Sequence, residues 1–191
     1  IDEFLQNAKE VDVDVLRDNK GNTMIAGIME HIEEAGIHSG DSACSIPPFS
    51  LNNKIISDIK KFSISLVNEL KILGLMNIQY AIKDDEIFIL EANPRASRTI
   101  PFLAKAIGIP FIKIAAELIV GKTLTEEYQN FDNNTLPYFA IKEAVFPFNK
   151  FPNTDVILGP EMKSTCDVMG IDEDFYLAYF KSQIGACLLY T

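Results

Sequence analysis

The sequence predicts an α+β domain in which a mixed, mainly antiparallel sheet is flanked by helices. Two periodic patterns lead to this prediction. Some stretches alternate apolar and polar residues, as half-buried strands do, whereas others repeat apolar residues every three or four positions, as amphipathic helices do. The two kinds of segment do not follow the regular repeat of a parallel sheet with crossover helices, so we expect most strand pairs to be antiparallel.

The composition fits one globular domain of ordinary size. The chain has 191 residues, of which 48% are hydrophobic and 23% charged, so it can bury a core. Its 27 acidic and 17 basic residues give a formal net charge of -10, which repels phosphate backbones and anionic lipids. We therefore expect small-molecule substrates and no nucleic-acid or membrane partner. An anionic ligand must be held by a few local positive groups or by a metal.

The cysteines and the first residues indicate a reducing compartment. Cys44, Cys166 and Cys187 lie far apart, without the spacing of a disulfide framework or a zinc site. The chain opens at Ile1 with no secretory signal, and the apolar stretch 102–121 contains charges and a proline, which a membrane span would not. We expect a cytoplasmic protein, or an organellar one in a eukaryote, and we expect the sequence to be an excerpt of a longer chain.

The first strands are predicted from alternation and turn residues. Valines alternate with aspartates across residues 11–15, the pattern of a half-buried strand. Residues 17–22 have turn chemistry, and residues 23–29 predict the returning strand. Residues 30–48 lose periodicity and contain glycines and a Pro-Pro pair. We expect a long ordered loop or a set of short strands there, carrying function.

The remaining elements are predicted from helical spacing and capping residues. Apolar residues three and four positions apart predict a helix over residues 52–73, and Gly74 is expected to end it in the left-handed conformation. The later elements are expected in this order: a hairpin over 75–94, a short helix capped by Ser97 and ending near Gly108, a helix opened by Pro110 and ending near Gly121, a strand over 136–146, an irregular stretch over 148–170 and a last helix capped by Asp172.

The hairpin over residues 75–94 determines which side chains share a face. Its predicted core faces are alternate apolar residues: Met76, Ile78, Tyr80 and Ile82 on the first strand, and Phe88, Leu90 and Ala92 on the second. Both sets lie on one side only if the connection has an odd number of residues, most simply residues 84–86. A two-residue connection would instead bury Glu91 beside Ile78, at a large desolvation cost.

The same register gathers polar side chains on the other face of the hairpin. It places Gln79 opposite Glu91, and Asn77 opposite Asn93. Opposed Cβ atoms lie roughly 5 Å apart, so Gln79, Glu91 and Asn93 can converge with one carboxylate and two amide oxygens. Hard oxygen ligands of this kind suit Mg²⁺ that keeps substrate phosphates in its shell. A solvated polar face is the alternative, and patterning alone leaves it open.

Two arginines follow the second strand directly. Arg95 and Arg98 lie between the strand end and a predicted helix start. Guanidinium groups suit phosphoryl and carboxylate oxygens, and a helix N-terminus adds N–H donors. Metal ligands followed at once by two arginines indicate phosphoryl transfer, in which positioning and charge neutralisation supply most of the catalysis.

Four stretches of the chain are recognisable as a group. Residues 91–102, which include Glu-Ala-Asn-Pro-Arg-Ala-Ser-Arg, closely resemble a stretch of the carbamoyl-phosphate synthase large-chain family. Residues 29–42, 74–79 and 159–165 resemble other stretches of that family, in family order over nearly the whole chain. Within the first of these, the run from Glu30 is similar to the second, C-terminal ATP-grasp half.

The resemblance implies a division of the chain. Residues 1–185 are expected to form a partial ATP-grasp domain, the C-terminal subdomain of that fold. Residues 186–191 are expected to begin a linker toward a regulatory domain that family members carry. Because the family clamps nucleotide between two subdomains and only one is substantially present, we expect the chain to be inactive as a synthase on its own.

The resemblance also implies an activity, that of an ATP-dependent ligase. In the family, carbamate derived from bicarbonate and ammonia attacks MgATP to give carbamoyl phosphate, which feeds arginine and pyrimidine synthesis. It implies ATP and Mg²⁺ or Mn²⁺ as cofactors, a bound K⁺, and a glutaminase small subunit as partner. Two alternatives stay open: another ATP-grasp enzyme that joins a carboxylate to an amine, and a non-catalytic nucleotide-binding fragment.

Family roles carry over to individual positions of this sequence. The resemblance implies metal ligation by Gln79, Glu91 and Asn93, and it implies that Arg95 and Arg98 are the catalytic residues. The residues implied to bind the nucleotide are Glu3, Leu5, Glu10, Gly36, Ile37, His38, Ser39, Gln79 and Glu91. Those implied to hold K⁺ are His31, Glu33, Ile37 and Ser42. The chain departs from the family at Cys166, where a glycine is usual, which puts the local backbone in doubt if a positive φ is needed there.

Overall fold

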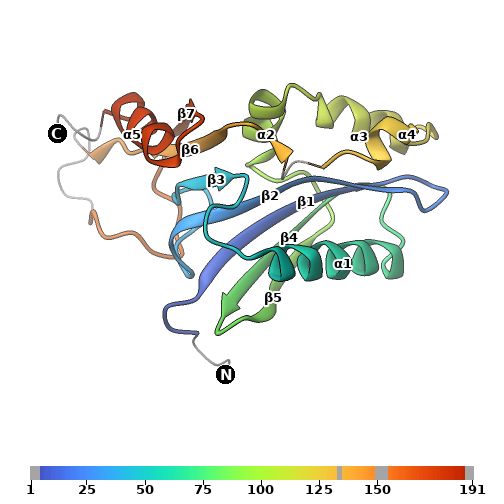
Figure 1. Cartoon of the computed structure of the whole chain (residues 1–191), viewed down its shortest axis with the longest axis horizontal. Helices are drawn as coiled ribbons and strands as arrows, with labels where there is room; N and C mark the ends of the chain where they lie inside the picture. Colours follow the sequence, from blue (N-terminus) through green and yellow to red (C-terminus); the bar gives the residue numbers. More distant parts are fainter. Residues whose placement is uncertain (1–4, 133–134, 149–154, 188–191) are drawn as a thin grey trace.

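Seven strands form one sheet in the computed structural model, which describes residues 5–132, 135–148 and 155–187 (Figure 1). The elements in chain order are β1 (Lys9–Arg17), β2 (Thr23–Glu34), β3 (Cys44–Ile46), α1 (Asn53–Glu69), β4 (Gly74–Lys83), β5 (Glu86–Asn93), α2 (Ile100–Ile107), α3 (Phe111–Ile119), α4 (Glu126–Gln129), β6 (Phe139–Val145), β7 (Cys166–Asp172) and α5 (Phe175–Gly185). The strand order is β5-β4-β1-β2-β3-β6-β7, and every neighbouring pair is antiparallel. The predicted fold class is confirmed.

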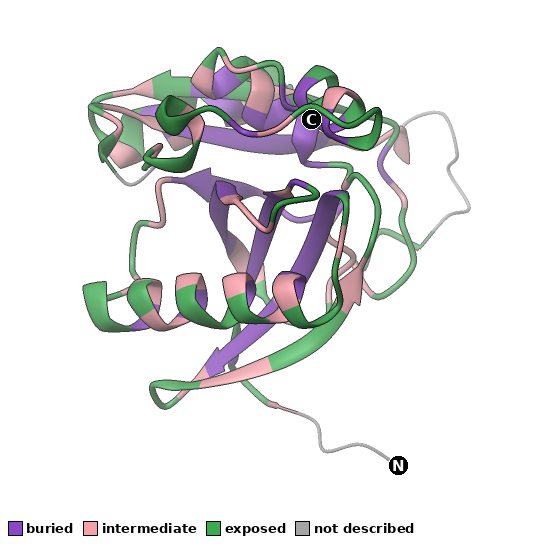
Figure 2. Ribbon diagram, turned by 90° about the vertical axis from the view of Figure 1, so that its right-hand side faces the viewer, coloured by how far each residue is buried: buried purple, intermediate pink, exposed green. Residues whose placement is uncertain are grey.

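The strands around β1 are covered on both faces. Helix α1 packs its buried residues, among them Ile55 and Ile59, against one face, where the valines of β1 lie (Figures 1 and 2). Helices α2 and α3 cover part of the other face, where Leu16 and Met24 lie. Apolar burial on both faces, at about 25 cal/mol per Å² removed from water, is what holds these layers together.

The apolar cover on the second face ends partway along the strands. Leu16 on β1 and Leu75 on β4 belong to the core under α2 and α3. On the same face, the residues two positions away from Leu16 and Leu75 are polar. They are Asp14 and Asn77, which pair with each other across β1 and β4. One sheet face is therefore apolar at one end and polar at the other, and the polar end carries the candidate site.

The β4–β5 hairpin reaches its predicted pairing by an unpredicted route. Lys83 pairs with Glu86, so the turn consists of residues 84–85 alone, with φ of 51° and 63°. These positive values are typical of the two-residue turns that hairpins favour. A bulge between Gln79 and Tyr80 then leaves Leu90 as an extra residue. The prediction of an odd connection over residues 84–86 is wrong, because the bulge supplies the change of phase instead.

The bulge changes which residues of β5 face the core. The pairing of Gln79 with Glu91, and of Asn77 with Asn93, is confirmed. Phe88 and Leu90, predicted to face the core with Ala92, do not. Ile87 and Ile89 oppose core residues of β4, and Ile87 and Ala92 pack on the α1 side. Between the turn and the bulge, the odd-numbered residue Ile87 therefore faces α1. Beyond the bulge, the odd-numbered residues Glu91 and Asn93 lie on the opposite face of the sheet.

Several other boundaries differ from the predictions for local reasons. Helix α1 ends at Glu69, not at residue 73, because Lys71 turns the chain with φ of 51°. Gly74 does have a positive φ of 92°, but it begins β4 and does not cap the helix. Strand β2 continues to Glu34, where a loop or short strands were predicted. The two predicted short helices are confirmed as α2 and α3, although Thr99 and not Ser97 is the N-cap of α2, which begins at Ile100.

The end of the chain contains a strand that periodicity did not predict. Strand β7 lies within and just beyond the stretch predicted as irregular, and it pairs with β6 at the end of the sheet. As an edge strand it is mostly exposed, so it lacks the buried alternation that identifies inner strands. Asp174, not Asp172, caps α5, since its carboxylate accepts a 2.9 Å hydrogen bond from the Leu177 N–H. Cys166 begins β7 without a positive φ, so the usual glycine is not required there.

No helix among the described residues is long and apolar enough to cross a membrane.

We predict that Gly170→Ala weakens the docking of α5 on β7. A Cβ atom at Gly170 would lie 2.1 Å from the Ala178 carbonyl oxygen and 2.6 Å from the Ser182 nitrogen, and backbone atoms cannot swing away. Overpacking of this kind costs about 1–3 kcal/mol of unfolding free energy, measurable by urea denaturation. The control is Gly159→Ala, whose Cβ would meet nothing within 4 Å and should change stability by less than about 0.5 kcal/mol. Equal stability of the two variants would contradict the packing described for α5.

Candidate functional site

A cleft of about 550 Å³ opens over the polar end of the sheet face. Its walls come from β1, β4, β5, the loop after β2 and the segment that leads into α2. The lining residues are Glu10, Asp12, Gly36, Ile37, His38, Ser39, Asn77, Gln79, Leu90, Glu91, Arg95, Ser97, Arg98, Thr99 and Pro160. Segments that are far apart in sequence therefore meet at one concave surface, the usual form of a small-molecule site.

The cleft brings together most of the residues singled out in the sequence. These are Glu10, Gly36, Ile37, His38, Ser39, Gln79, Glu91, Arg95 and Arg98. Asn93 adjoins the cleft, since its Nδ2 donates a 2.6 Å hydrogen bond to Glu91 Oε1. Leu5 is half-buried and does not line the cleft, and Glu3 lies outside the described residues.

The predicted metal ligands lie at the open edge of the sheet. Gln79 and Glu91 are directly opposed on β4 and β5, and both line the cleft. Glu91 is exposed, so a cation there keeps access to water and to a bound ligand. One carboxylate with neighbouring amide oxygens is a donor set that fits a hard divalent ion such as Mg²⁺, which retains several other ligands.

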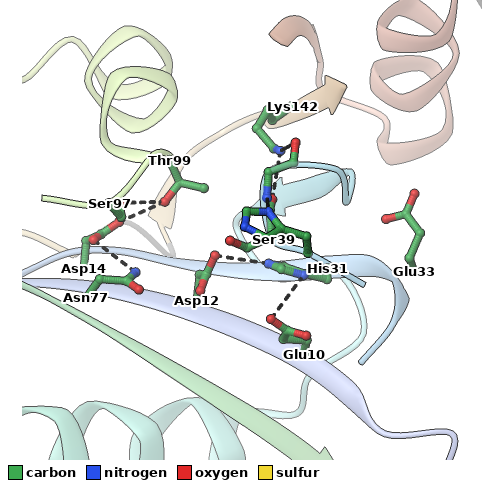
Figure 3. Close-up of polar contacts among 12 residues, drawn as sticks. Glu10, Asp12, Asp14, His31, Glu33, Ser39, Asn77, Ser97, Thr99 and Lys142 are labelled. Atoms are coloured by element: carbon green, nitrogen blue, oxygen red, sulfur yellow. Dashed lines mark hydrogen bonds and ion pairs between the residues drawn. The ribbon is translucent and has the colours of Figure 1, made fainter. Parts of the chain in front are cut away.

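A second group of side chains that could hold a cation is buried beside the cleft, and two of its members, Glu10 and Asp12, line it. One ligand atom from each of Glu10, Asp12 and His31 lies within 4.8 Å of the others (Figure 3). His31 Nε2 is 3.2 Å from Asp12 Oδ2, and His31 Nδ1 is 3.9 Å from Glu10 Oε1. Burial alone would lower the pKa of His31, but the hydrogen bond and charge of Asp12, together with the charge of Glu10, raise that pKa overall. Burial raises the pKa of Glu10.

Two atoms of this group, Asp12 Oδ1 and His31 Nδ1, are buried without a hydrogen-bond partner within the described residues, and so is Ser42 Oγ. Buried polar atoms are nearly always paired, because an unpaired one loses its hydration without compensation. Of the other residues implied to hold K⁺, Glu33 accepts a 2.7 Å hydrogen bond from the Ala43 N–H, and Ile37 lines the cleft. Unpaired oxygens and buried negative charge are what a bound cation would satisfy.

Behind this group, Asp14 is fully buried and accepts three hydrogen bonds. Its donors are Asn77 Nδ2 at 3.2 Å, Ser97 Oγ at 2.8 Å and Thr99 Oγ1 at 3.2 Å (Figure 3). Burial first, and then the charge of Asp12, raises the pKa of Asp14 to about 7, although the three hydrogen bonds oppose that shift. Asp14 joins the strands to the arginine-bearing segment.

Sequence reasoning missed several of these residues. Asp12 and Asp14 were taken only as the polar phase of a half-buried strand, but they are 2% and 0% exposed. Asn77 was placed in the register and given no role, and it is buried beside Asp14. The alternation along β1 could have identified them. Its three acids share one face of the strand, and Asp12 pairs with Gln79, so that face is the one that carries the predicted metal ligand.

The two arginines line the same cleft as Glu10, Asp12 and Glu91. Arg95 and Arg98 are exposed and line the cleft. Arg95 Nη1 donates to the Ala96 carbonyl at 3.1 Å, and Arg98 Nη1 contacts Met162 Sδ. Within the described part of the chain neither guanidinium forms an ion pair, so both charges are available to an anion in the cleft.

The loop that follows β2 is supported from behind. The His38 N–H donates a 2.8 Å hydrogen bond to the Gly159 carbonyl, and Asp41 accepts from the Lys163 and Ser164 N–H groups at 2.7 and 2.9 Å. The buried Lys142 donates to the Ser39 carbonyl at 3.2 Å (Figure 3). The cleft-lining residues 36–39 are thus carried on a loop that is tied to β6 and to the segment before β7.

Glu143 is another buried acid near this wall. Burial, followed by the charge of Glu33, raises the pKa of Glu143 to about 7. Its carboxylate accepts hydrogen bonds from the Ala144 N–H at 3.2 Å and from the side chain of Gln183 on α5. It adds to the concentration of buried acids on this side of the molecule.

Comparison with known proteins agrees with the sequence resemblance. Residues 1–127 match the family model described as carbamoyl-phosphate synthase L chain, ATP binding domain. The carbamoyl phosphate synthase large chain of Nostoc sp. is 55% identical over 192 residues, which cover 97% of this chain but only 17% of that protein.

Solved structures of lower sequence identity share the fold. A biotin carboxylase of Campylobacter jejuni in complex with β,γ-ATP has a TM-score of 0.64 at 16% identity, covering 76% of this chain and 31% of that one. The biotin carboxylase domain of a thermophilic 2-oxoglutarate carboxylase bound to ADP has a TM-score of 0.65 at 15% identity, covering 88% and 42%. At these identities the likeness establishes an ATP-grasp fold, which agrees with the predicted subdomain.

We predict that Glu143 makes the chain less stable as the pH rises. The folded protein binds the Glu143 proton more tightly than the unfolded chain does, whose ordinary pKa is 4.5. This contribution is therefore fully present below about pH 4.5 and is lost as the pH rises through about 7. The Glu143→Gln variant lacks this titrating group. The difference between its unfolding free energy and that of the parent should therefore increase by about 2 kcal/mol in favour of the variant as the pH rises from about 5 to about 8.

The measurement is urea denaturation of both proteins across that pH range. Glu69→Gln, an exposed substitution at the end of α1, serves as control and should follow the parent at every pH. Parallel pH profiles for the Glu143→Gln variant and the parent would contradict the prediction.

Proposed function

Because this chain belongs to the carbamoyl-phosphate synthase large-chain ATP-binding family, we propose that its cleft holds MgATP while carbamate is phosphorylated to carbamoyl phosphate. The family is one of ATP-dependent ligases. The observation that carries the proposal is the convergence of opposed oxygen ligands, Gln79 and Glu91, with two unpaired arginines in one cleft. Phosphoryl transfer needs this combination, since it depends on neutralising and aligning phosphate oxygens.

The chain would supply ligands for a metal ion and positively charged donors for the reacting groups. Gln79, Glu91 and Asn93 would hold Mg²⁺ or Mn²⁺, which, when bound, draws negative charge from the phosphate oxygens. Arg95 and Arg98 donate to the transferring group or to the carboxylate of carbamate. The carbamate oxygen forms the new bond to the γ-phosphorus, the bond from that phosphorus to ADP breaks, and no side chain is needed as a nucleophile.

The remaining cleft residues fit the rest of a nucleotide. Glu10 would accept hydrogen bonds from the ribose hydroxyls, and residues 36–39 would lie against the nucleotide. Glu3 and Leu5 are assigned to the adenine by the sequence resemblance alone. A K⁺ near the ribose would satisfy His31, Ser42 and their acidic neighbours. The unpaired buried atoms of that group support this part of the proposal, because they need a partner.

The wider assignments extend beyond the part of the protein in hand. The chain spans 17% of the Nostoc relative, so the activity of a whole enzyme is itself a proposal. In that enzyme we expect a glutaminase small subunit, a cytoplasmic or organellar location, and a product that feeds arginine and pyrimidine synthesis. The division at residue 185 into a partial ATP-grasp domain and the start of a linker belongs to the same proposal.

We predict that Glu91→Gln lowers the affinity of the chain for Mn²⁺ by at least about tenfold. Losing the one charged oxygen donor of the metal set removes most of its attraction for a divalent ion. The measurement is titration of free Mn²⁺ by electron paramagnetic resonance. The control is Glu86→Gln, an exposed carboxylate at the other end of the same strand that does not line the cleft. Unchanged Mn²⁺ affinity in the Glu91→Gln variant would contradict the metal assignment.

We predict that Arg95→Ala and Arg98→Ala each slow phosphoryl transfer by about a hundredfold, as loss of a transition-state donor does. The assay uses the Nostoc large chain in which this sequence replaces the matching segment, and it follows ATP formation from carbamoyl phosphate and MgADP. Lys105→Ala removes an exposed positive charge on α2 outside the cleft, and it should leave the rate unchanged. Near-normal rates in both arginine variants would refute the role of these residues.

A further inference from the structure

We propose that Asp14 is a positioning residue that holds Arg98 in place through the hydroxyl groups on either side of it. Its effect on phosphoryl transfer rests on the proposed function, whereas its effect on the conformation of the segment does not.

The carboxylate of Asp14 joins two parts of the fold. Asn77 Nδ2 donates to Oδ1 from the neighbouring strand, at 3.2 Å. Ser97 Oγ and Thr99 Oγ1 both donate to Oδ2, at 2.8 and 3.2 Å, from the segment between β5 and α2 (Figure 3). One strand side chain therefore fixes two nearby points of the segment.

Those two points enclose Arg98 in the sequence. Ser97 Oγ also accepts a 3.2 Å hydrogen bond from the Ile100 N–H, so the same hydroxyl ties Asp14 to the first residue of α2. The segment has neither helix nor strand over residues 94–99 and has no ladder of backbone hydrogen bonds to hold it. With Ser97 and Thr99 anchored, the Cα of Arg98 is held between them, and only its side-chain rotors remain free.

Asp14 does not line the cleft, so it can affect a ligand there only through other residues. It is 0% exposed and is not among the residues that line the cleft, whereas Asp12, on the same face of β1, is. Asp14 thus lies between the open polar cleft and the apolar core that begins at Leu16. A buried carboxylate in that place is costly unless its acceptor sites are used, and the described donors to it come from Asn77 and from the two residues that flank Arg98.

The position of Arg98 matters because its side chain is exposed and makes no ion pair within the described residues. A guanidinium aids transfer only if its donors stand where charge develops on the phosphoryl group. A displacement of about 1 Å at such a group costs on the order of a hundredfold in rate. Releasing the segment should therefore reduce turnover with little change in nucleotide binding, which other residues supply.

The first experiment is hydrogen exchange on the chain itself. In Asp14→Asn, the amides of residues 95–99 should exchange at least about tenfold faster, while those of β1 and β4 keep the parent rates. The pair Ser97→Ala with Thr99→Val removes the same tether from the loop side without touching the strand, and it should give the same result. Asp18→Asn is the matched control, because Asp18 is also fully buried and hydrogen-bonded but its donors lie at residues 20, 22 and 124.

The second experiment measures kinetics in the Nostoc chimera described above. Asp14→Asn should lower kcat for ATP formation by at least about tenfold and change KM for MgADP by less than about threefold. The variant that combines Asp14→Asn with Ser97→Ala and Thr99→Val should have the same kcat as Asp14→Asn alone, because both sets of substitutions break the same hydrogen bonds.

The outcomes separate this inference from the proposed function. Unchanged exchange at residues 95–99 in both tether variants overturns the inference, as do kinetic effects that multiply independently or fall on KM alone. A chimera with the parent sequence that forms no ATP from carbamoyl phosphate and MgADP would instead refute the proposed function. The exchange experiment on the chain would still decide whether Asp14 holds the segment.

Discussion

The alternation of β1 is the constraint on which the rest of the structure depends. This strand lies inside the sheet, between β4 and β2, and both of its faces are covered. Its valines pack against α1, so the other phase, from Glu10 through Asp12 and Asp14 to Leu16, must occupy the opposite face. A slip of one residue would bury the acids against α1 and expose the valines, so apolar packing on one side determines the position of the polar groups on the other.

The β4–β5 hairpin reconciles two demands that a regular ladder cannot meet together. Near the turn, Ile87 needs the α1 side, whereas at the far end Glu91 and Asn93 need the cleft side. These residues have the same parity along β5, so an unbroken strand would place all of them on one face. The bulge at Leu90 inverts the phase between them. An irregularity of one residue thus lets the same short strand serve the core and the site.

The cleft combines buried acids of β1 with exposed charged side chains. Burial, with a contribution from the charge of Asp12, raises the pKa values of Glu10 and Asp14, and a cation beside these acids would relieve the repulsion between them. The same cleft carries two arginines without an acidic partner within the described residues. A metal and the arginines would both be within this cleft to bind an anionic ligand.

The sequence by itself determined the elements with strong periodicity and the polar residues near the hairpin. Alternation identified β1 and β4, helical spacing identified α1, and the register predicted that Gln79 lies opposite Glu91. Only the tertiary structure decided the route to that register, since a two-residue turn with a bulge and an odd loop give the same pairing at residues 79 and 91. It also revealed β7, an exposed edge strand that leaves no buried period. The tether of Asp14 to Ser97 and Thr99 joins residues more than 80 positions apart, and no local pattern encodes a contact that exists only when the sheet and the segment before α2 are packed together.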